Sequence, residues 1–276
     1  MSIHELRSNY LKLEEGIEMH YLEKGEGKPM IFIPGLTFSG EIFSNQIDYF
    51  SKSHRVIAID PRSQGLSTMT LHGNDYMTHG LDLAKLIEEL DLDDITLVGW
   101  STGNLDLWSY VRQFGTGRLR AAVTIDMSPV PMSSDPKDWT EAGIEDLRQV
   151  FSQILTSPEG TRDFFSEYAT EVMLEGNVTS SRLSYLLDIS ARTPYYICSA
   201  LFANAVFSDF SKVARKISEE IPSLMFIARH WAAVAEPYMK TRFPETETLV
   251  MGGHLMFYEY PEAWNSALET FLNKSQ

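Results

Sequence analysis

The first half of the chain alternates short apolar runs with longer segments of helical periodicity. Strands are predicted from the apolar runs at residues 16–24, 29–33, 55–59, 95–98 and 119–125. Between two of these runs, Leu81, Ala84, Ile87 and Leu90 follow the spacing of one helix face. Alternation of this kind predicts an α/β fold, in which helices flank a mostly parallel sheet.

The pattern changes after residue 130. A stretch rich in Pro and Ser opens a segment of helical pattern that carries no further strand signal until about residue 213. Strands are predicted again at 223–228 and 246–251, with helices at 232–241 and 259–272. We therefore expect a core formed by residues 1–130 and 214–276, with a helical lid, or cap, at 131–213 inserted between two strands.

Composition and charge limit the kinds of partner that this chain is expected to bind. The 276 residues are 43% hydrophobic, enough for one substantial core, and 38 acidic against 23 basic residues give a formal charge of −15. This charge argues against nucleic acid or an anionic membrane surface as partner. The apolar runs are too short for a membrane span, and the single cysteine, Cys198, fits a reducing compartment. We expect a cytoplasmic monomer or homodimer that acts on a small molecule.

The most informative segment is Gly99-Trp100-Ser101-Thr102-Gly103, directly behind the apolar run 95–98. A serine on a sharp strand-to-helix turn needs small residues two positions before and after it, because a side chain there would collide with the neighbouring strand or helix. The helical run 105–114 follows the turn. We therefore predict Ser101 to be a nucleophile, presented at the carboxyl edge of the sheet.

A serine hydroxyl needs an imidazole to accept its proton and a carboxylate to orient that imidazole. Among the seven histidines, His254 follows the last predicted strand in a Gly-Gly-His loop, so it reaches the same sheet edge as Ser101. The carboxylate is expected to be Asp126, which ends the strand 119–125. Glu236, within a predicted helix, is the alternative, because the loop 228–233 contains no acid.

Two backbone N–H groups are needed to stabilise an oxyanion. Thr102, at the start of the helix after the nucleophile, offers one, and Leu36, in the Pro-Gly turn after an early strand, offers the other. We expect Trp100, His230, Trp231 and Tyr195 to line the pocket. Because the lid segment is rich in aromatic residues, an apolar or aromatic substrate is expected. No cluster of His, Cys, Asp or Glu has the spacing of metal ligands.

These motifs resemble the α/β-hydrolase superfamily over nearly the whole chain. The resemblance rests on residues 34–37 (PGLT), 60–67 (DPRSQGLS), 99–103 and 252–254. It is strongest to the bacterial esterases known as non-haem haloperoxidases or arylesterases. It implies a cofactor-free serine hydrolase, with Ser101 as nucleophile, His254 as base, and a haloperoxidase side reaction that proceeds through a peracid.

The sequence departs from that pattern in three places. The usual acid after the lid is missing, and Trp231 stands at about that position, so the placement of the acid resembles haloalkane dehalogenases and cofactor-free quinolone dioxygenases. Dehalogenases carry an aspartate where this chain has Ser101. Pro34-Gly35 replaces a frequent His-Gly pair, and Asn104 replaces a common second glycine.

The predicted function is hydrolysis of a carboxylic ester, thioester or lactone through an acyl-enzyme on Ser101. One alternative is a proton-abstraction enzyme that uses the same His and Asp, such as a cofactor-free dioxygenase or a carbon–carbon hydrolase. Another is a ligand receptor of the same fold.

Overall fold

The computed structural model describes residues 5–141, 143–176 and 178–274. Its strands are β1 (Arg7–Glu14), β2 (Ile17–Lys24), β3 (Lys28–Ile33), β4 (His54–Ile59), β5 (Ile95–Trp100), β6 (Leu119–Ile125), β7 (Ser223–Ile227) and β8 (Glu247–Val250). They form one sheet in the order β1-β2-β4-β3-β5-β6-β7-β8. Strands β3 to β8 are parallel, whereas β2 is antiparallel to both of its neighbours. The predicted α/β-hydrolase architecture is confirmed.

The helices form two groups. Those around the sheet are α1 (Ser44–Phe50), α2 (Tyr76–Glu89), α3 (Gly103–Phe114), α8 (Ser211–Glu220), α9 (Ala232–Arg242), α10 (Met256–Glu259) and α11 (Pro261–Lys274), with the short turn η1 (Gly40–Phe43). Those between β6 and α8 are α4 (Ile144–Gln149), η2 (Val150–Ile154), α5 (Pro158–Tyr168), η3 (Ala169–Met173), α6 (Ser180–Ser190) and α7 (Tyr195–Val206).

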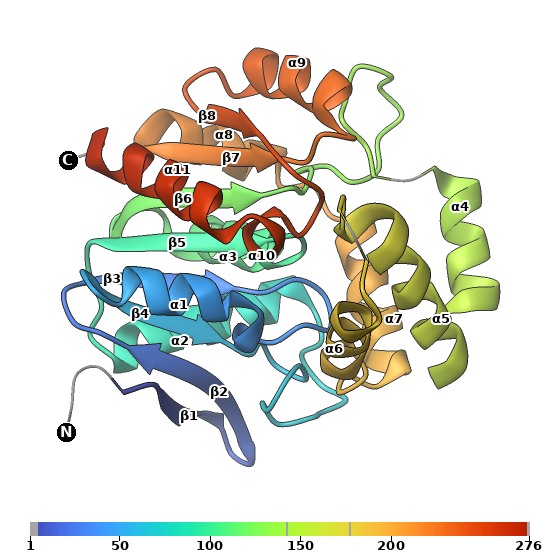
Figure 1. The fold of residues 1–276 in the computed structure, drawn as a ribbon, viewed down its shortest axis with the longest axis horizontal. Coiled ribbons are helices and arrows are strands. Elements are labelled where there is room, and N and C mark those ends of the chain that lie inside the picture. Colours follow the sequence, from blue (N-terminus) through green and yellow to red (C-terminus); the bar gives the residue numbers. More distant parts are fainter. Residues whose placement is uncertain (1–4, 142, 177, 275–276) are drawn as a thin grey trace.

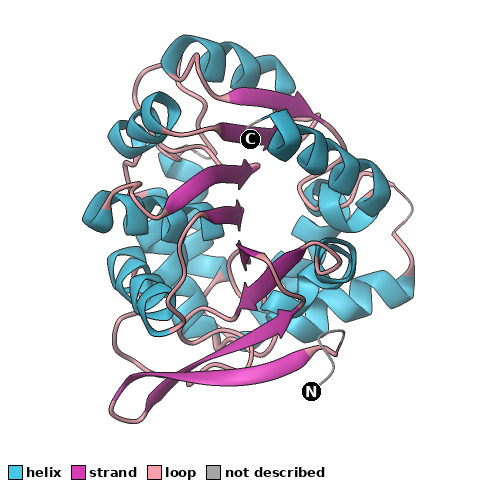
Figure 2. Cartoon of the chain, turned by 90° about the vertical axis from the view of Figure 1, so that its left-hand side faces the viewer, coloured by secondary structure: helices cyan, strands magenta, loops and turns pink. Residues whose placement is uncertain are grey.

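The helices of the first group cover both faces of the sheet. In Figure 1, α1 and α11 lie in front of the strands, and α2, α3 and α8 lie behind them. Figure 2 looks at the sheet from the side, with its twist and the long β1–β2 pair at one edge. Strands β5 and β7 are buried along their whole length, as expected for parallel strands covered on both faces.

Helices α4 to α7 lie together beyond the carboxyl ends of the parallel strands (Figure 1). This arrangement suits the predicted cap at 131–213, and the division into core and cap stays a prediction. Helix α8 begins at Ser211 and packs against α3 beside the sheet. In the described part of the chain, none of the helices has the length and hydropathy that a membrane span requires.

Candidate active site

Ser101 occupies the sharp turn between β5 and α3. Its backbone has a φ of 53°, in the left-handed region that non-glycine residues rarely adopt. Ser101 N–H donates to the carbonyl oxygen of Ile125 on the neighbouring strand (2.9 Å), and Thr102 is the N-cap of α3. This turn holds the serine side chain at the carboxyl end of the sheet.

The glycines around Ser101 have the steric role that the sequence suggested. A Cβ at Gly103 would collide with the carbonyl oxygen of Ile33, and one at Gly99 would lie 2.6 Å from Asn104 Oδ1. A Cβ at Gly35 would lie 2.9 Å from that of Ser101. Asn104, which replaces a common glycine, is buried and donates from Nδ2 to the Ile125 carbonyl oxygen (3.0 Å).

Strand register brings Asp126 next to Ser101. Trp100 pairs with Ile125 across β5 and β6, so the following residues, Ser101 and Asp126, leave the sheet side by side. Asp126 also has a positive φ, 49°. Its N–H donates to the carbonyl oxygen of Phe226 on β7 (2.8 Å).

Asp126 and His254 form a buried pair. His254 Nδ1 lies 2.7 Å from Asp126 Oδ2, and Oδ1 accepts a hydrogen bond from the N–H of Ala228 (2.8 Å). Asp126 is fully buried and His254 is 2% exposed. The carboxylate therefore fixes the ring orientation and keeps the proton on Nδ1, which leaves Nε2 as the acceptor.

Glu236, the alternative acid, is exposed on α9, where it lines a shallow hollow on the outside of the molecule. Asp126, and not Glu236, accepts the hydrogen bond from His254 Nδ1.

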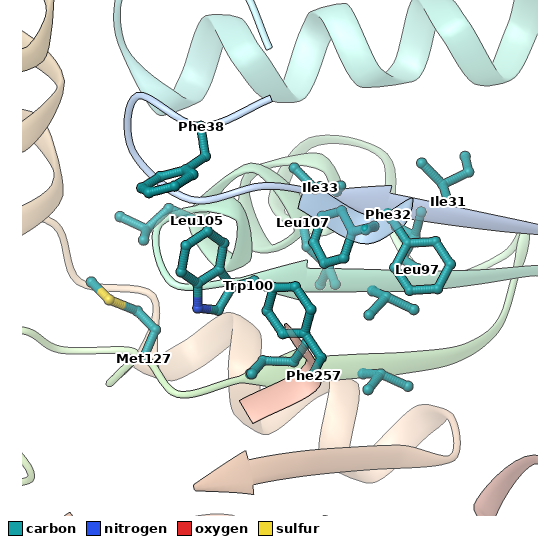
Figure 3. Packing of buried hydrophobic residues seen from close by; sticks show 14 of the residues in the cluster. Ile31, Phe32, Ile33, Phe38, Leu97, Trp100, Leu105, Leu107, Met127 and Phe257 are labelled. Carbon is teal, nitrogen blue, oxygen red and sulfur yellow. The ribbon is translucent and has the colours of Figure 1, made fainter. Parts of the chain in front are cut away.

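The loop that carries His254 is held from two sides. The N–H groups of His254 and Leu255 donate to the carbonyl oxygens of Val172 (3.2 Å) and Met173 (2.8 Å) in η3. Trp100 Nε1–H donates to the His254 carbonyl oxygen (2.8 Å). In Figure 3 the Trp100 ring lies between Phe38 and Phe257, with ring centroids 5.1 and 5.3 Å away. The imidazole is thus backed by packed aromatic rings.

A cavity of about 450 Å³ opens beside Ser101 and His254. Its walls are mainly apolar and aromatic and come from the strand ends and from the segment 127–206. They include Leu36, Phe38, Trp100, Met127, Leu147, Phe164, Phe165, Tyr168, Phe202 and Trp231. Such a volume and lining suit a small, largely apolar ligand.

Most of the predicted pocket residues meet at this cavity. Leu36, Thr102, Trp100, His230 and Trp231 all line it together with Ser101 and His254.

Tyr195 does not line this cavity. It lies at the start of α7, along a separate cavity of about 500 Å³ lined by parts of α5, α6 and α7. Helical periodicity predicted this segment as a helix, but it could not predict which side of the cap the first turn faces.

Leu36 and Thr102, the two predicted oxyanion donors, both line the cavity. Within the described residues, the N–H groups of Leu36 and Thr102 make no hydrogen bond, while neighbouring N–H groups of the same turns do. Thr102 also lies at the N-terminus of α3, where the helix dipole favours negative charge.

Nε2 of His254 is buried and has no hydrogen-bond partner among the described residues. Ser101 Oγ therefore makes no hydrogen bond to this nitrogen among the described residues. Catalytic hydrogen bonds often tighten only when a ligand is bound.

Two polar cavity residues escaped the sequence analysis, Glu141 and Tyr168. Burial raises the pKa of the Glu141 carboxyl to about 8; the hydrogen bond from the Ser128 N–H lowers this pKa in part, and the negative charge of Asp126 raises it. Burial and then the charge of Glu141 raise the pKa of Tyr168. The ring of Tyr168 lies edge-on to that of His254, with the ring centroids 5.6 Å apart. Neither residue belongs to a motif, so only the fold could bring them to the site.

Burial lowers the pKa of His230, which lines the same cavity.

A metal site is not evident in the part of the chain that the structure describes, which contains no group of three or more His, Cys, Asp or Glu suited to an ion.

Comparison with known proteins finds several similar haloperoxidases. A non-heme chloroperoxidase of Kitasatospora aureofaciens is 40% identical over 123 residues, 44% of this chain and 45% of that protein. A non-heme haloperoxidase of Rhodococcus erythropolis is 33% identical over 161 residues, 54% of this chain and 59% of that protein. The matches to these two relatives span about half of their length.

Solved structures are similar over almost the whole chain. The crystal structure of a bromoperoxidase from Bacillus anthracis superposes with a TM-score of 0.87 at 26% identity, covering 97% of this chain and all of that one. An esterase from Exiguobacterium antarcticum shares the fold, with a TM-score of 0.85 at 18% identity over 97% of this chain and all of that one. Residues 28–172 match the family described as alpha/beta hydrolase fold. The chain belongs to the alpha/beta hydrolase family.

Proposed function

We propose that this chain is a serine hydrolase that cleaves carboxylic esters, thioesters or lactones through an acyl-enzyme on Ser101. The observation that carries the proposal is the convergence of Ser101 with the buried Asp126–His254 pair at one apolar cavity. The names of the relatives support it, because they include haloperoxidases and, at 25% identity and a TM-score of 0.79, a putative aryl esterase from Burkholderia cenocepacia.

In this mechanism Ser101 Oγ attacks the acyl carbonyl carbon while His254 Nε2 takes the hydroxyl proton. The N–H groups of Leu36 and Thr102 stabilise the tetrahedral oxyanion. His254 then gives its proton to the oxygen or sulfur atom of the leaving group as the bond from that atom to the acyl carbon breaks. A water molecule then attacks the acyl-enzyme while His254 takes its proton, and His254 returns a proton to Ser101 Oγ as the acid leaves. Asp126 stabilises the imidazolium in both steps.

The test is hydrolysis of p-nitrophenyl acetate and butanoate by the wild type and by Ser101→Ala, together with labelling by a fluorophosphonate. We expect kcat to fall on the order of 10⁴-fold or more in Ser101→Ala, with loss of the label. A matched thermal melt of the two proteins checks that the fold is kept.

Other outcomes point elsewhere. Turnover that survives in Ser101→Ala would contradict the acyl-enzyme and favour proton abstraction by the Asp126–His254 pair. Labelling of Ser101 without turnover of either ester would favour a ligand receptor.

A further inference from the structure

The cavity beside Ser101 contains a carboxyl group that acyl transfer does not use, that of Glu141. The Ser128 N–H donates to Glu141 Oε1 (2.9 Å), and the Glu141 N–H donates to the Pro131 carbonyl oxygen (2.8 Å). Ser128 also donates from Oγ to the Trp139 carbonyl oxygen. These bonds close the segment that follows Asp126 and fix the Glu141 carboxyl at the cavity wall.

The surroundings favour the neutral form of this carboxyl. No Lys or Arg lines the cavity within the described residues, and the nearby charge of Asp126 is negative. An unpaired charge in an apolar site is costly, so the group keeps its proton instead. The raised pKa, about 8, means that most Glu141 side chains are protonated at neutral pH.

The position of the proton follows from the hydrogen bond to Ser128. Because Oε1 accepts from the Ser128 N–H, the proton of the neutral carboxyl lies on Oε2. A hydrogen-bond donor in an apolar cavity favours ligands that carry an acceptor over ligands that do not, because a ligand without an acceptor leaves the donor unpaired. An acyl group attached to Ser101 would occupy the cavity that this donor also lines.

We propose that Glu141 determines substrate specificity by donating a hydrogen bond from Oε2 to an ether or carbonyl oxygen in the acyl chain of the substrate. This inference rests on the proposed esterase function for its catalytic readout. It narrows the substrate class from apolar esters to esters whose acyl chain carries one further oxygen acceptor.

The experiment compares p-nitrophenyl esters in pairs that differ by one oxygen in place of a methylene group. The pairs are butanoate with methoxyacetate, pentanoate with 3-methoxypropanoate, and hexanoate with 4-methoxybutanoate. For each pair, the ratio of kcat/KM values is divided by the ratio of spontaneous hydrolysis rates. We expect the wild type at pH 7 to prefer the ether ester by about 3- to 10-fold at one chain position, as for one hydrogen bond.

Two variants of Glu141 separate hydrogen bonding from shape. Glu141→Gln keeps both an acceptor for Ser128 and an N–H donor, so it should retain the preference at every pH. Glu141→Leu has no donor and should lose it. In the wild type the preference should shrink above about pH 8, where the Glu141 carboxyl loses its proton.

Other titrating groups share this cavity. They are Tyr168, His230 and His254, with Asp126 behind His254. The ionisation of the Asp126–His254 pair affects both esters of a pair, so it cancels in the ratio. A pH-dependent preference that arises from Tyr168 or His230 would persist in Glu141→Leu, whereas one that arises from Glu141 would not.

Two results would overturn the inference. One is an equal ether preference in the wild type and Glu141→Leu at all three chain positions. The other is a preference for butanoylcholine over its neutral isostere 3,3-dimethylbutyl butanoate that grows above pH 8 and disappears in Glu141→Gln, because Glu141 would then act as a carboxylate that binds cations.

A binding measurement separates this inference from the proposed function. Calorimetry on Ser101→Ala with the methyl esters of the same acids needs no catalysis. A 3- to 10-fold tighter Kd for an ether ester, lost in Ser101→Ala/Glu141→Leu, would support the role of Glu141 even if Ser101-dependent hydrolysis were absent. Hydrolysis that depends on Ser101 without any such preference would support the esterase and reject the role of Glu141.

Discussion

At the scale of single residues, the site depends on two backbone positions that glycine would normally occupy. Ser101 and Asp126 both have left-handed backbone conformations, and each follows a buried strand whose register places them side by side. Strain of this kind persists only where the surrounding structure fixes it. It turns both side chains out of the sheet toward His254 and the cavity.

Asp126 should matter to catalysis far more than Glu236. Asp126→Asn puts an N–H donor or a carbonyl oxygen where His254 Nδ1 meets a carboxylate oxygen, so the imidazole loses its orienting charge and its preferred tautomer. We expect kcat for p-nitrophenyl butanoate to fall about 10³- to 10⁴-fold.

The matched control is Glu236→Gln, which also neutralises one carboxylate but lies exposed on α9. Its kcat should stay within about twofold of wild type, since surface substitutions of this kind have small effects. Equal losses in the two variants would reject Asp126 as the orienting acid.

At the scale of elements, the β5–α3 turn depends on the absence of side chains at two glycines. The backbone of Gly103 packs against the end of β3, where a Cβ would meet the carbonyl oxygens of Ile33 and Pro34. Backbone atoms cannot swing aside as a flexible side chain can. The fit of α3 against the sheet therefore limits residue 103 to glycine.

Gly103→Ala should destabilise the protein by about 1–3 kcal/mol through overpacking. A chain of this size loses roughly 2–4 °C in Tm for each kcal/mol, which thermal unfolding can measure. Gly117→Ala is the control, because its Cβ would meet nothing within 4 Å, and its Tm should stay unchanged or rise slightly. A Tm for Gly103→Ala equal to that of Gly117→Ala would show that the backbone around residue 103 can shift at little cost in free energy.

Strands with a strong apolar pattern could be predicted from the sequence, whereas one exposed strand and one short helix were missed. The runs at 95–98 and 223–228 correspond to buried β5 and β7. Strand β1 (Arg7–Glu14) was missed because it is an edge strand, exposed at most positions, so its sequence does not show a buried face. Helix α1 (Ser44–Phe50) was missed because it is too short for periodicity to be evident.

At the scale of the whole molecule, the site combines segments that the sequence keeps far apart. Asp126, His254 and Ser101 could be proposed because each follows a predicted strand, and parallel strands end at one edge. Glu141 and Tyr168 could not, because neither lies in a motif and their burial depends on how the segment after β6 folds over the sheet. The orientation of Tyr195 depends on the same packing.

The carboxyl of Glu141, partly exposed at the cavity wall, should also make the stability of the whole chain depend on pH. Its pKa is about 8 in the folded protein against an ordinary value of 4.5. Between these values the unfolded chain ionises while the folded one keeps its proton, so rising pH favours unfolding by up to about 1.4 kcal/mol per pH unit. Below pH 4.5 and above pH 8 this contribution no longer changes.

Glu141→Gln removes this titration and keeps the shape of the side chain. Thermal unfolding from pH 5 to 9 should therefore show the Tm of Glu141→Gln rising relative to wild type up to about pH 8 and then staying level. Glu236→Gln, which removes an exposed carboxylate, should follow the wild type at every pH. Parallel curves for wild type and Glu141→Gln would mean that the Glu141 carboxyl ionises as freely in the folded chain as in water, and its neutral form would then be unavailable as a donor to the substrate.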